Sequence, residues 1–478
     1  MTKTNNVKNQ PMKNSFLLPA LALLLSLASC DGRKTISGNE LAAGFAETPD
    51  SIQTSVYWYW ISNHISADGV RRDLESMKRI GIDRAFIGNI GLEDSESGEG
   101  PVKFYSEAWW EVMHTALKTA TKLGIDIGIF NCPGWSQSGG PWVEPQQSMR
   151  YLANTSTRIT GGQLVETDLP RPAGERSADF QDVKVIAFPA IDGRTLTPAD
   201  TEITTTPSVP HPEQLIDGDP DTSVELLPAG SQSREVTLEF TTDRPFTLRS
   251  LKLRVTEAPV DCPARLEAEL DGTLHTLAEF PVTRFNPALH VGFDPYAPIV
   301  ISVPATASTR FRLVFADATP GFGLREAELS SLPVVERYPE KTLAKMYQTP
   351  LPYWHEYMWR VQPAADDPSQ VIKPGDILDI SDCLEGDRLT WNAPAGEWTV
   401  LRTGMLPTGV VNSPARPEAQ GLETDKMSKQ HIEAHFEAFL GEIYRRIPAE
   451  DRKCWKVVVE DSYETGGQNF TDGFLEAF

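Results

Sequence analysis

In the first part of the chain, stretches whose hydrophobic residues have helical spacing are each followed by a short apolar run. In "VRRDLESMKRIGIDRAFIGN", Val70, Leu74 and Met77 share one helical face, Gly81 follows the face, and a short apolar run comes next. The stretch "WWEVMHTALKTATKLGIDIGIFN" repeats this plan, with Gly124 after the helix. Such spacing predicts an amphipathic helix, a glycine cap and a strand in each stretch. With the strand "SVYWYWISN" before them, the order predicts parallel pairing through right-handed crossovers.

The pattern changes in the middle of the chain, from about residue 159 to 397. Short alternating runs such as "REVTLEF", "LRSLKLRV", "ARLEAEL" and "TRFRLVFAD" are separated by turn residues. This is typical of an antiparallel β-sandwich.

Helical periodicity returns in "SKQHIEAHFEAFLGEIYRRI", where Ser428 can cap the start, and the valines of "KVVVEDSYE" predict one more buried strand. The predicted helical stripe comprises Ile432, Phe436, Phe439, Leu440 and Ile443.

Together these patterns predict an α/β protein. Its first and last parts are expected to form a partial (β/α)8 barrel, interrupted by an inserted antiparallel β-sandwich. A doubly wound sheet is the alternative. No G-x-G-x-x-G motif follows the first strand, which disfavours a dinucleotide-binding fold.

Composition removes several classes of function. The chain has 66 acidic and 44 basic residues, a formal net charge of −22, which disfavours nucleic acid and anionic lipid as partners. Eleven tryptophans suit a protein that stacks rings on sugars, although most tryptophans serve cores or interfaces. The five cysteines form no C-x-x-C pair, so neither a zinc site nor a disulfide framework is indicated.

The N-terminal segment carries a targeting signal. In "MKNSFLLPALALLLSLASC" a lysine precedes an apolar run from Phe16 to Leu27 that is too short for a comfortable membrane span. Residues 1–30 are therefore predicted to be a signal peptide. The small residues before Cys30 resemble a bacterial lipobox, which predicts an exported lipoprotein of the periplasm or outer membrane, held to the membrane only by lipid on Cys30. An ordinary signal peptide with a chance cysteine is the alternative.

Three carboxylates follow the last predicted strand. Glu460, Asp461 and Glu464 come directly after the valine run. In barrels of parallel strands, the carboxyl ends of the strands carry the catalytic groups. Closely spaced carboxylates suit acid–base work on a glycosidic bond. A solvated acidic turn or a structural ion pair is the alternative.

Four long stretches closely resemble glycoside hydrolase family 106, the α-L-rhamnosidases of Bacteroidetes and relatives. They are "SVYWYWISNHISADGVRRDLESMKRIGI", "FNCPGWSQSGGPWVEPQQSM", "PEAQGLETDKMSKQHIEAHFEAFL" and "VVVEDSYETGGQNFTDGF". The resemblance implies a catalytic (β/α)8 barrel with β-sandwich insertions, removal of terminal α-L-rhamnosyl residues from glycans or glycosides with inversion, and dependence on Ca2+.

The resemblance also implies roles for individual residues. It places the general acid on Glu464, with Asp461 next; Glu460 stays open as a packed or metal-linked group. Cys132 is expected to be a small packed residue. Trp58 and Trp60 could instead be core residues, whereas Glu423, Asp425 and Lys426 could bind sugar hydroxyls or Ca2+, with a solvated charged turn as the alternative. The candidates for substrate binding are Trp58, Trp60, Asn63, Asn131, Trp135, Trp142, Glu423, Asp425 and Lys426.

Within the predicted sandwich, "LIDGDPDTSVELLP" and "LREAELSSL" resemble the calcium loop and closing strand of discoidin-like, galactose-binding jelly rolls. Ca2+ favours such oxygen-rich loops. The same letters also make a good turn, and Val224 stands where such domains often have tryptophan. The implied Ca2+ ligands are Asp217, Asp219, Thr222 and Glu328.

These predictions divide the chain into four parts. Residues 1–30 are the signal peptide, 45–152 the first part of the barrel, 153–410 the β-rich insertion with a jelly roll at 205–333, and 411–478 the resumed barrel. Only four barrel strands are predicted, so we expect the general base beyond residue 478 and no activity of this chain alone. Two rival hypotheses are a non-catalytic surface glycan-binding lipoprotein and a barrel hydrolase for another sugar.

Overall fold

The computed structural model describes residues 37–47, 52–92, 98–174, 176–284, 294, 296–342, 362–365, 367–462 and 466–478. The chain forms two compact units, residues 1–54 and 55–478. In the first unit, helix α2 (Gly38–Ala46) begins at a capping box: the Ser37 side chain accepts from the Glu40 N–H, and the Glu40 carboxylate accepts from the Ser37 N–H.

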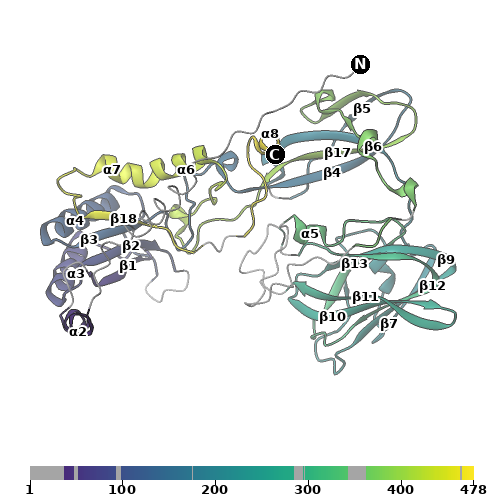
Figure 1. The fold of residues 1–478 in the computed structure, drawn as a ribbon, viewed down its shortest axis with the longest axis horizontal. Coiled ribbons are helices and arrows are strands. Elements are labelled where there is room, and N and C mark those ends of the chain that lie inside the picture. Colours follow the sequence, from purple (N-terminus) through teal and green to yellow (C-terminus); the bar gives the residue numbers. More distant parts are fainter. Residues whose placement is uncertain are drawn as a thin grey trace, which may run out of the picture. The chain divides into compact units, whose positions relative to one another are not determined.

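A four-stranded parallel sheet opens the second unit (Figure 1). The strands lie in the order β1 (Ser55–Ile61), β2 (Arg84–Ile90), β3 (Asp126–Phe130) and β18 (Trp455–Val459). Helices α3 (Ala67–Ile80) and α4 (Glu107–Leu123) join the first three strands, and each helix ends at a left-handed glycine, as predicted. The last strand therefore pairs with β3 although the β-rich insertion separates them in sequence.

One face of this sheet is covered by helices. Its side chains, including Ile87 and Ile129, form one apolar cluster with Leu74 of α3 and Met113 of α4. A continuous helix also joins this cluster; it consists of α6 (Lys429–Phe436), the π-helical turn η10 (Glu437–Gly441) and α7 (Glu442–Arg446).

The predicted stripe on that helix is only partly correct. Phe439, Leu440 and Ile443 are fully buried, but Ile432 and Phe436 are 37% and 42% exposed. The π turn contains an extra residue, which rotates the part before it relative to the part after it. His435 consequently takes the buried position in α6.

The other face of the parallel sheet carries aromatic residues. Tyr57 and Tyr59 on β1, Phe86 on β2 and Phe130 on β3 alternate with the helix-facing residues. Tyr57 is 59% exposed, whereas Phe130 is buried. We refer to this surface of the sheet as the open face.

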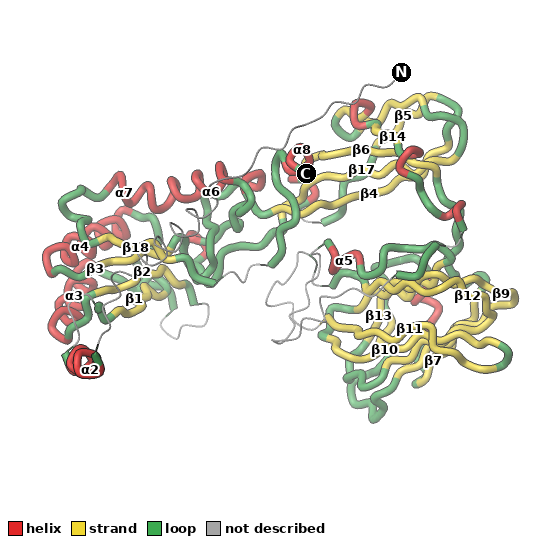
Figure 2. Tube along the Cα trace, viewed as in Figure 1, coloured by secondary structure: helices red, strands yellow, loops and turns green. Residues whose placement is uncertain are grey.

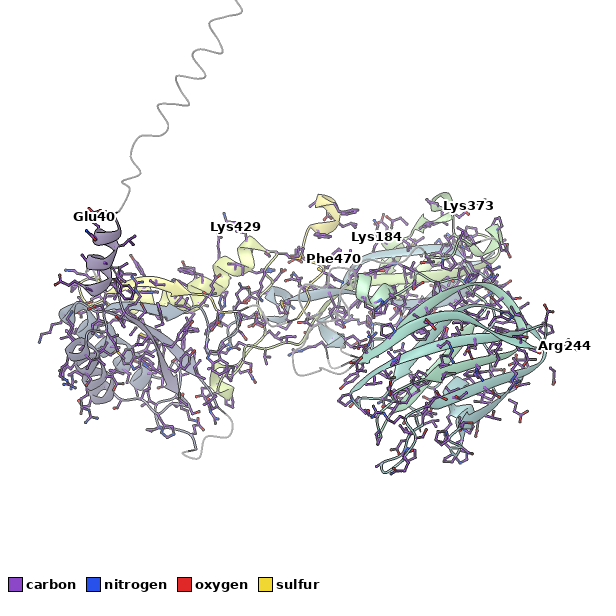
Figure 3. The ribbon with its side chains drawn as sticks, turned by 60° about the horizontal axis from the view of Figure 1, so that its bottom comes forward. Glu40, Lys184, Arg244, Lys373, Lys429 and Phe470 are labelled. Atoms are coloured by element: carbon purple, nitrogen blue, oxygen red, sulfur yellow. The ribbon has the colours of Figure 1, made fainter. Side chains whose placement is uncertain are left out.

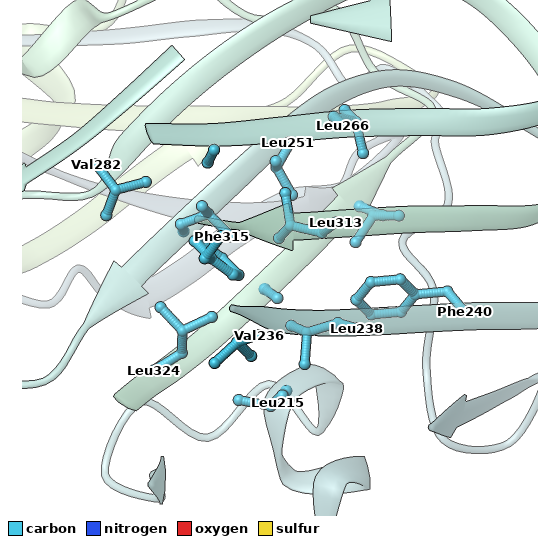
Figure 4. Close-up of a cluster of buried hydrophobic side chains, with 14 of the residues drawn as sticks. Leu215, Val236, Leu238, Phe240, Leu251, Leu266, Val282, Leu313, Phe315 and Leu324 are labelled. Carbon is cyan, nitrogen blue, oxygen red and sulfur yellow. The ribbon is translucent and has the colours of Figure 1, made fainter. Parts of the chain in front are cut away.

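The middle of the chain forms an antiparallel sheet, as predicted, in the order β11-β10-β12-β9-β13-β8 with β7 on β9. The two longest strands, β9 and β12, pair with irregularities at Ser302–Thr306 and Ser308–Arg310. Their inward residues, such as Phe240, Leu313 and Phe315, interdigitate in one apolar core (Figure 4). The strands are β7 (Thr201–Thr206), β8 (Val224–Glu225), β9 (Val236–Val255), β10 (Val260–Leu270), β11 (Thr273–Arg284), β12 (Ile299–Phe315) and β13 (Gly323–Ser330).

Two smaller antiparallel sheets complete the β-rich region (Figure 2). The first has the order β14-β6-β17-β4 and the second β15-β16-β5. Arg402, which is 1% exposed, binds the Asp182 carboxylate through two nitrogens at 2.7 and 2.8 Å and donates to the Leu169 and Gly386 carbonyls, so it ties the two sheets together. The strands are β4 (Arg150–Thr160), β5 (Leu164–Asp168), β6 (Gln181–Pro189), β14 (Leu378–Asp379), β15 (Leu384–Glu385), β16 (Arg388–Asn392) and β17 (Glu397–Pro407).

The sheet boundaries differ from the boundaries suggested by the sequence. The expected division at residue 152 falls inside β4, and the expected start of the jelly roll at 205 falls inside β7. Two short α-helices remain among the described residues, α5 (Tyr338–Lys341) and α8 (Phe474–Ala477). In the described part of the chain, no helix has the length and apolar character needed to cross a membrane.

Candidate active site

The carboxyl ends of β1, β2, β3 and β18 meet at one edge of the parallel sheet, because all four strands run the same way. The Ser62 N–H donates to the Ile90 carbonyl at 2.7 Å, and the Asn131 N–H donates to the Val459 carbonyl at 2.8 Å. Glu460 and Asp461 follow β18 at this edge. Glu464, the predicted general acid, lies outside the described residues.

The end of β1 is held by a strained turn. Ser62 and Asn63 both have left-handed backbones, with φ of 46° and 67°. The Asn63 Nδ2 donates to Glu418 at 2.6 Å and to Glu99 at 3.3 Å. A Cβ at Gly100 would lie 2.3 Å from the Asn63 carbonyl carbon, so only glycine fits against this turn. Asn63 does lie at the edge, but its amide nitrogen is already bound by carboxylates.

The loop after β3 presents an exposed tryptophan, Trp135, at the carboxyl edge of the parallel sheet. Asn131 donates from Nδ2 to the Gln137 carbonyl at 3.0 Å, and Cys132 Sγ donates to the Ser136 carbonyl at 2.9 Å. These contacts fold the loop so that Trp135 is 40% exposed, with its ring 6.1 Å from that of Tyr59. Cys132 is fully packed, as predicted, and burial raises the pKa of its thiol well above the ordinary value.

A buried histidine fixes this loop to the helix above it. The Trp142 indole N–H donates to His435 Nδ1 at 2.9 Å, so His435 Nε2 carries the proton and donates to the Asn131 carbonyl at 3.2 Å. Burial lowers the pKa of His435 to about 4. The sequence did not indicate His435, because it lies 304 residues from Asn131 and no local pattern links the two.

Three of the tryptophans predicted to stack on sugars pack into the helix-covered core. Trp58 and Trp60 are 7% and 4% exposed on the helix-covered face, and the Trp58 N–H donates to Asp73. Trp142 stacks on Phe439 with ring centroids 5.4 Å apart and planes at 13°. Trp58 and Trp60 are thus enclosed by the core, whereas Trp142 is partly buried and packs against it.

A buried ion pair lies beside the edge. Glu423 is fully buried, and its Oε2 accepts from Ser138 Oγ and Lys426 Nζ, both at 2.7 Å. Its other oxygen has no hydrogen-bond partner among the described residues. The charges of Glu423, Lys426, Asp461 and Glu460 all act on the pKa of the Cys132 thiol, which places the ion pair near the carboxylates of β18. A solvated charged turn is therefore the wrong interpretation of this stretch.

Asp425 belongs to a different network. It is fully buried and accepts from Arg150 at 3.0 Å, Thr471 at 2.7 Å and Gln468. These bonds hold the Asp425 carboxylate inside this network.

One group of three possible metal ligands occurs among the described residues. The ligand atoms of Asp425, His431 and Asp472 lie within 4.8 Å of one another. The Arg150 guanidinium bonds both aspartates, at 3.0 and 2.7 Å, and already supplies their counter-charge. A cation at this place would meet that fixed positive charge, so the group does not fit a metal site.

The environment of His435 predicts a pH dependence. Between pH 6.5 and 4 the unfolded chain protonates this histidine and the folded chain does not, so stability falls as the pH decreases through this window. Over the whole window the loss attributable to His435 is about 3 kcal/mol. We expect His435→Gln to show a flatter pH dependence of the unfolding free energy in denaturant titrations. The exposed His275→Gln is the matched control, and an unchanged slope in His435→Gln would contradict the assignment.

The chain is similar to known glycosidases over most of its length. A family model described as alpha-L-rhamnosidase, glycoside hydrolase family 106, matches residues 46–478. The structure resembles that of a rhamnosidase from Novosphingobium sp. PP1Y with a TM-score of 0.73 and 27% identity, over 91% of this chain and 41% of that one. A protein of Formosa agariphila named "Putative beta-glucuronidase" is 23% identical over 465 residues, 97% of this chain and 27% of that protein.

This chain thus spans well under half the length of both relatives. Because the family match covers nearly the whole sequence, the chain belongs to glycoside hydrolase family 106.

Proposed function

We propose that this chain forms part of a glycosidase that removes terminal α-L-rhamnosyl residues from glycans or glycosides with inversion at the anomeric carbon. One observation carries the proposal. Glu460 and Asp461 follow β18 at the edge where the ends of β1 and β3 also meet, with Trp135 exposed beside them. The family to which the chain belongs supplies the choice of sugar.

The chemistry requires two carboxyl groups with different tasks. A protonated one gives its proton to the glycosidic oxygen as the bond to the anomeric carbon breaks. An ionised one takes a proton from the water that attacks the opposite face, and the two lie roughly 6.5–9.5 Å apart. We assign the acid to Glu464, with Asp461 next. We assign the base to a part of the longer relatives that this chain does not span, so this chain alone should not turn over substrate.

The open face supports a further part of this proposal, the (β/α)8 barrel. In such a barrel, one face of each strand is covered by helices and the other points to the interior. The face with Trp58 and Trp60 is covered, whereas Tyr57 and Ile61 on the other face are 59% and 39% exposed. We interpret the four strands as one part of a barrel whose interior the open face would line, with the carboxyl end of that face at the active site.

A β-glucuronidase is the second candidate, because one relative has that name. A glucuronide carries a carboxylate, which an unpaired cation would bind best. Two cations at the edge are already paired: Lys426 with Glu423 at 2.7 Å, and Arg416 with Glu99 at 3.5 Å. This pairing favours a neutral sugar.

We propose a Ca2+ site at the loop with Asp217, Asp219 and Thr222. Asp217 accepts from the Asp219 N–H at 2.9 Å, and the Thr222 hydroxyl donates to the Asp219 carbonyl at 3.0 Å. Beside the loop, Glu326 is 9% exposed, and one of its oxygens has no partner among the described residues. Burial and the charge of Asp217 raise the pKa of Glu326 to about 7. A cation would relieve both features, so these residues fit the ion.

The fourth expected ligand, Glu328, takes a different position. It is half-exposed and lies 3.5 Å from Lys252, so an ammonium group already balances its charge. Glu326 is therefore the carboxylate beside the loop that most needs a cation, and a direct bond from Glu328 would require its pair with Lys252 to open.

We also propose that the protein is an exported lipoprotein of the cell envelope. The support is the apolar run followed by Leu27, Ala28, Ser29 and Cys30, which lies outside the described residues. Lipid on Cys30 would hold the enzyme at the membrane, close to sugars arriving from outside the cell.

The catalytic assignment predicts a substrate-dependent loss. In a longer protein with rhamnosidase activity, Glu464→Gln should lose about 10²–10⁴-fold in kcat/KM on a rhamnoside with a poor leaving group. It should lose much less on a nitrophenyl rhamnoside, whose leaving group hardly needs a proton. Glu460→Gln and Asp461→Asn are the comparison variants. Equal losses on both substrates would move the acid elsewhere, first to Asp461. Glycan binding without any turnover would instead favour the non-catalytic alternative.

The calcium proposal predicts a stability shift. At a hundredfold excess over Kd, Ca2+ bound only to the folded chain adds about 2.7 kcal/mol of stability. Thermal melting with Ca2+ and with a chelator should show this difference in the native chain and lose it in Asp217→Asn. Asp271→Asn, in the exposed turn between β10 and β11, is the control. A melting temperature indifferent to calcium and chelator would exclude the site.

The anchor predicts a change of cell fraction. Cys30→Ser should move the protein from the membrane fraction to the soluble fraction, because the acylated residue is gone. Cys383→Ser, a change of a cysteine within the folded region, should leave the fractionation unchanged. If Cys30→Ser still sediments with membranes, the lipobox interpretation fails.

A further inference from the structure

We propose that Tyr59 and Trp135 form an aromatic platform that receives the apolar face of a neutral deoxy sugar beside Asp461. This inference rests on the glycosidase function proposed above and names the residues that hold the sugar. Trp135 was expected from the sequence to bind substrate, whereas Tyr59 was not. It is the structure that brings the two rings together from β1 and from the loop after β3.

The geometry of the open face builds the platform. The Tyr59 ring lies 6.1 Å from Trp135 with planes at 52°, and it stacks on Tyr57 at 5.5 Å and 21°. Phe130 supports Tyr57 and Tyr59 from below at 5.7 and 6.1 Å and is itself 1% exposed. Trp135 is 40% exposed at the end of this row. The rings of Tyr57, Tyr59 and Trp135 therefore form a continuous aromatic surface that extends to the carboxyl edge of the parallel sheet.

The absence of a side chain at Gly88 lets the Tyr59 ring lie flat against the sheet. Gly88 on β2 stands opposite Tyr59 in the register of the sheet. A Cβ there would lie 3.2 Å from the Tyr59 ring and 3.3 Å from the Phe130 ring. With glycine, the Tyr59 ring can lie across β2 and reach Phe130. A larger residue would push the tyrosine away from the sheet, so the flat placement of the ring depends on this position.

The platform lies next to a carboxylate. The Asp461 charge reaches the Tyr59 hydroxyl: burial, Tyr57 and Asp461 together raise the pKa of Tyr59, against a hydrogen bond from Trp135. Asp461 is itself partly exposed and accepts from the Ser462 N–H at 2.7 Å. A carboxylate beside an aromatic surface is suited to sugars, because the hydroxyls donate to the carboxylate while the C–H face packs on the rings.

The charges at the edge select the class of sugar. Glu460 and Asp461 are acidic, and the nearby cations Arg416 and Lys426 are paired with carboxylates. An acidic sugar on the platform would place its carboxylate near Asp461, and the described part of this edge offers it only these two paired cations. A neutral sugar with a methyl group avoids this repulsion and adds apolar contact with the rings.

Saturation-transfer difference NMR on the full chain tests the platform. With methyl α-L-rhamnopyranoside as the probe, we expect saturation of the methyl protons and of one ring face, and weaker signals from methyl β-D-glucuronide. Trp135→Ala and Tyr59→Ala should each weaken rhamnoside binding by about 3- to 10-fold, the range for one aromatic contact. Tyr59→Phe keeps the ring and should bind within about twofold of the native chain.

Tyr444→Ala is the matched control. Tyr444 is 57% exposed on α7, away from the open face, so its removal should leave binding unchanged. Unchanged rhamnoside binding in both Trp135→Ala and Tyr59→Ala, no binding by the native chain, or tighter binding of the glucuronide would each overturn the platform. Failure of the proposed function has a different signature, which is rhamnoside binding that depends on both rings in a longer protein without rhamnosidase activity.

Discussion

A single buried guanidinium, that of Arg150, holds three distant stretches of this chain together. At the start of β4 it bonds Asp425 in the loop before α6, Asp472 near the C-terminal helix and Gln181 at the start of β6. Arg150 is 1% exposed, and a buried cation without partners costs several kcal/mol. The stretch around Phe470, labelled in Figure 3, also pairs with Arg150 through the backbone. The loop that carries Glu423 and Lys426 is thereby fixed beside the edge of the parallel sheet.

Side-chain direction explains why several of the predicted site residues are buried. The sequence shows that Trp58 and Trp60 point the same way, but a two-residue period cannot say which face meets the helices. The structure gives that face to the tryptophans and leaves the open face to Tyr57 and Tyr59. Tryptophan is often buried because its ring is largely apolar, and aspartate can be buried where its charge is paired, as Asp425 is with Arg150.

Local patterns predicted the local structure well. The helix–strand units and their glycine caps at Gly81 and Gly124 follow from short-range spacing, and so do the alternating strands of the middle region. What the sequence could not supply were pairs of residues far apart in the chain, such as Trp142 with His435 and Arg150 with Asp472. Such pairs depend on how the sheets pack. The sequence also did not indicate the π turn in the helix after Ser428. A π turn fits an extra residue into a helix, and no local sequence pattern in this stretch signals that extra residue.

The pairing of β4 with β17 has a consequence for how the chain folds. Arg150 stands opposite Pro407 in that pair, so the long β-rich insertion enters and leaves at the same place. Before the insertion folds, joining β18 to β3 closes a loop of more than 300 residues. Once β4 and β17 are joined, only residues 131–149 and 408–454 remain to be closed, and the entropic cost falls by about 1 kcal/mol. Synthesis from the N-terminus makes the insertion before β18, so the order of translation matches the order that lowers this barrier.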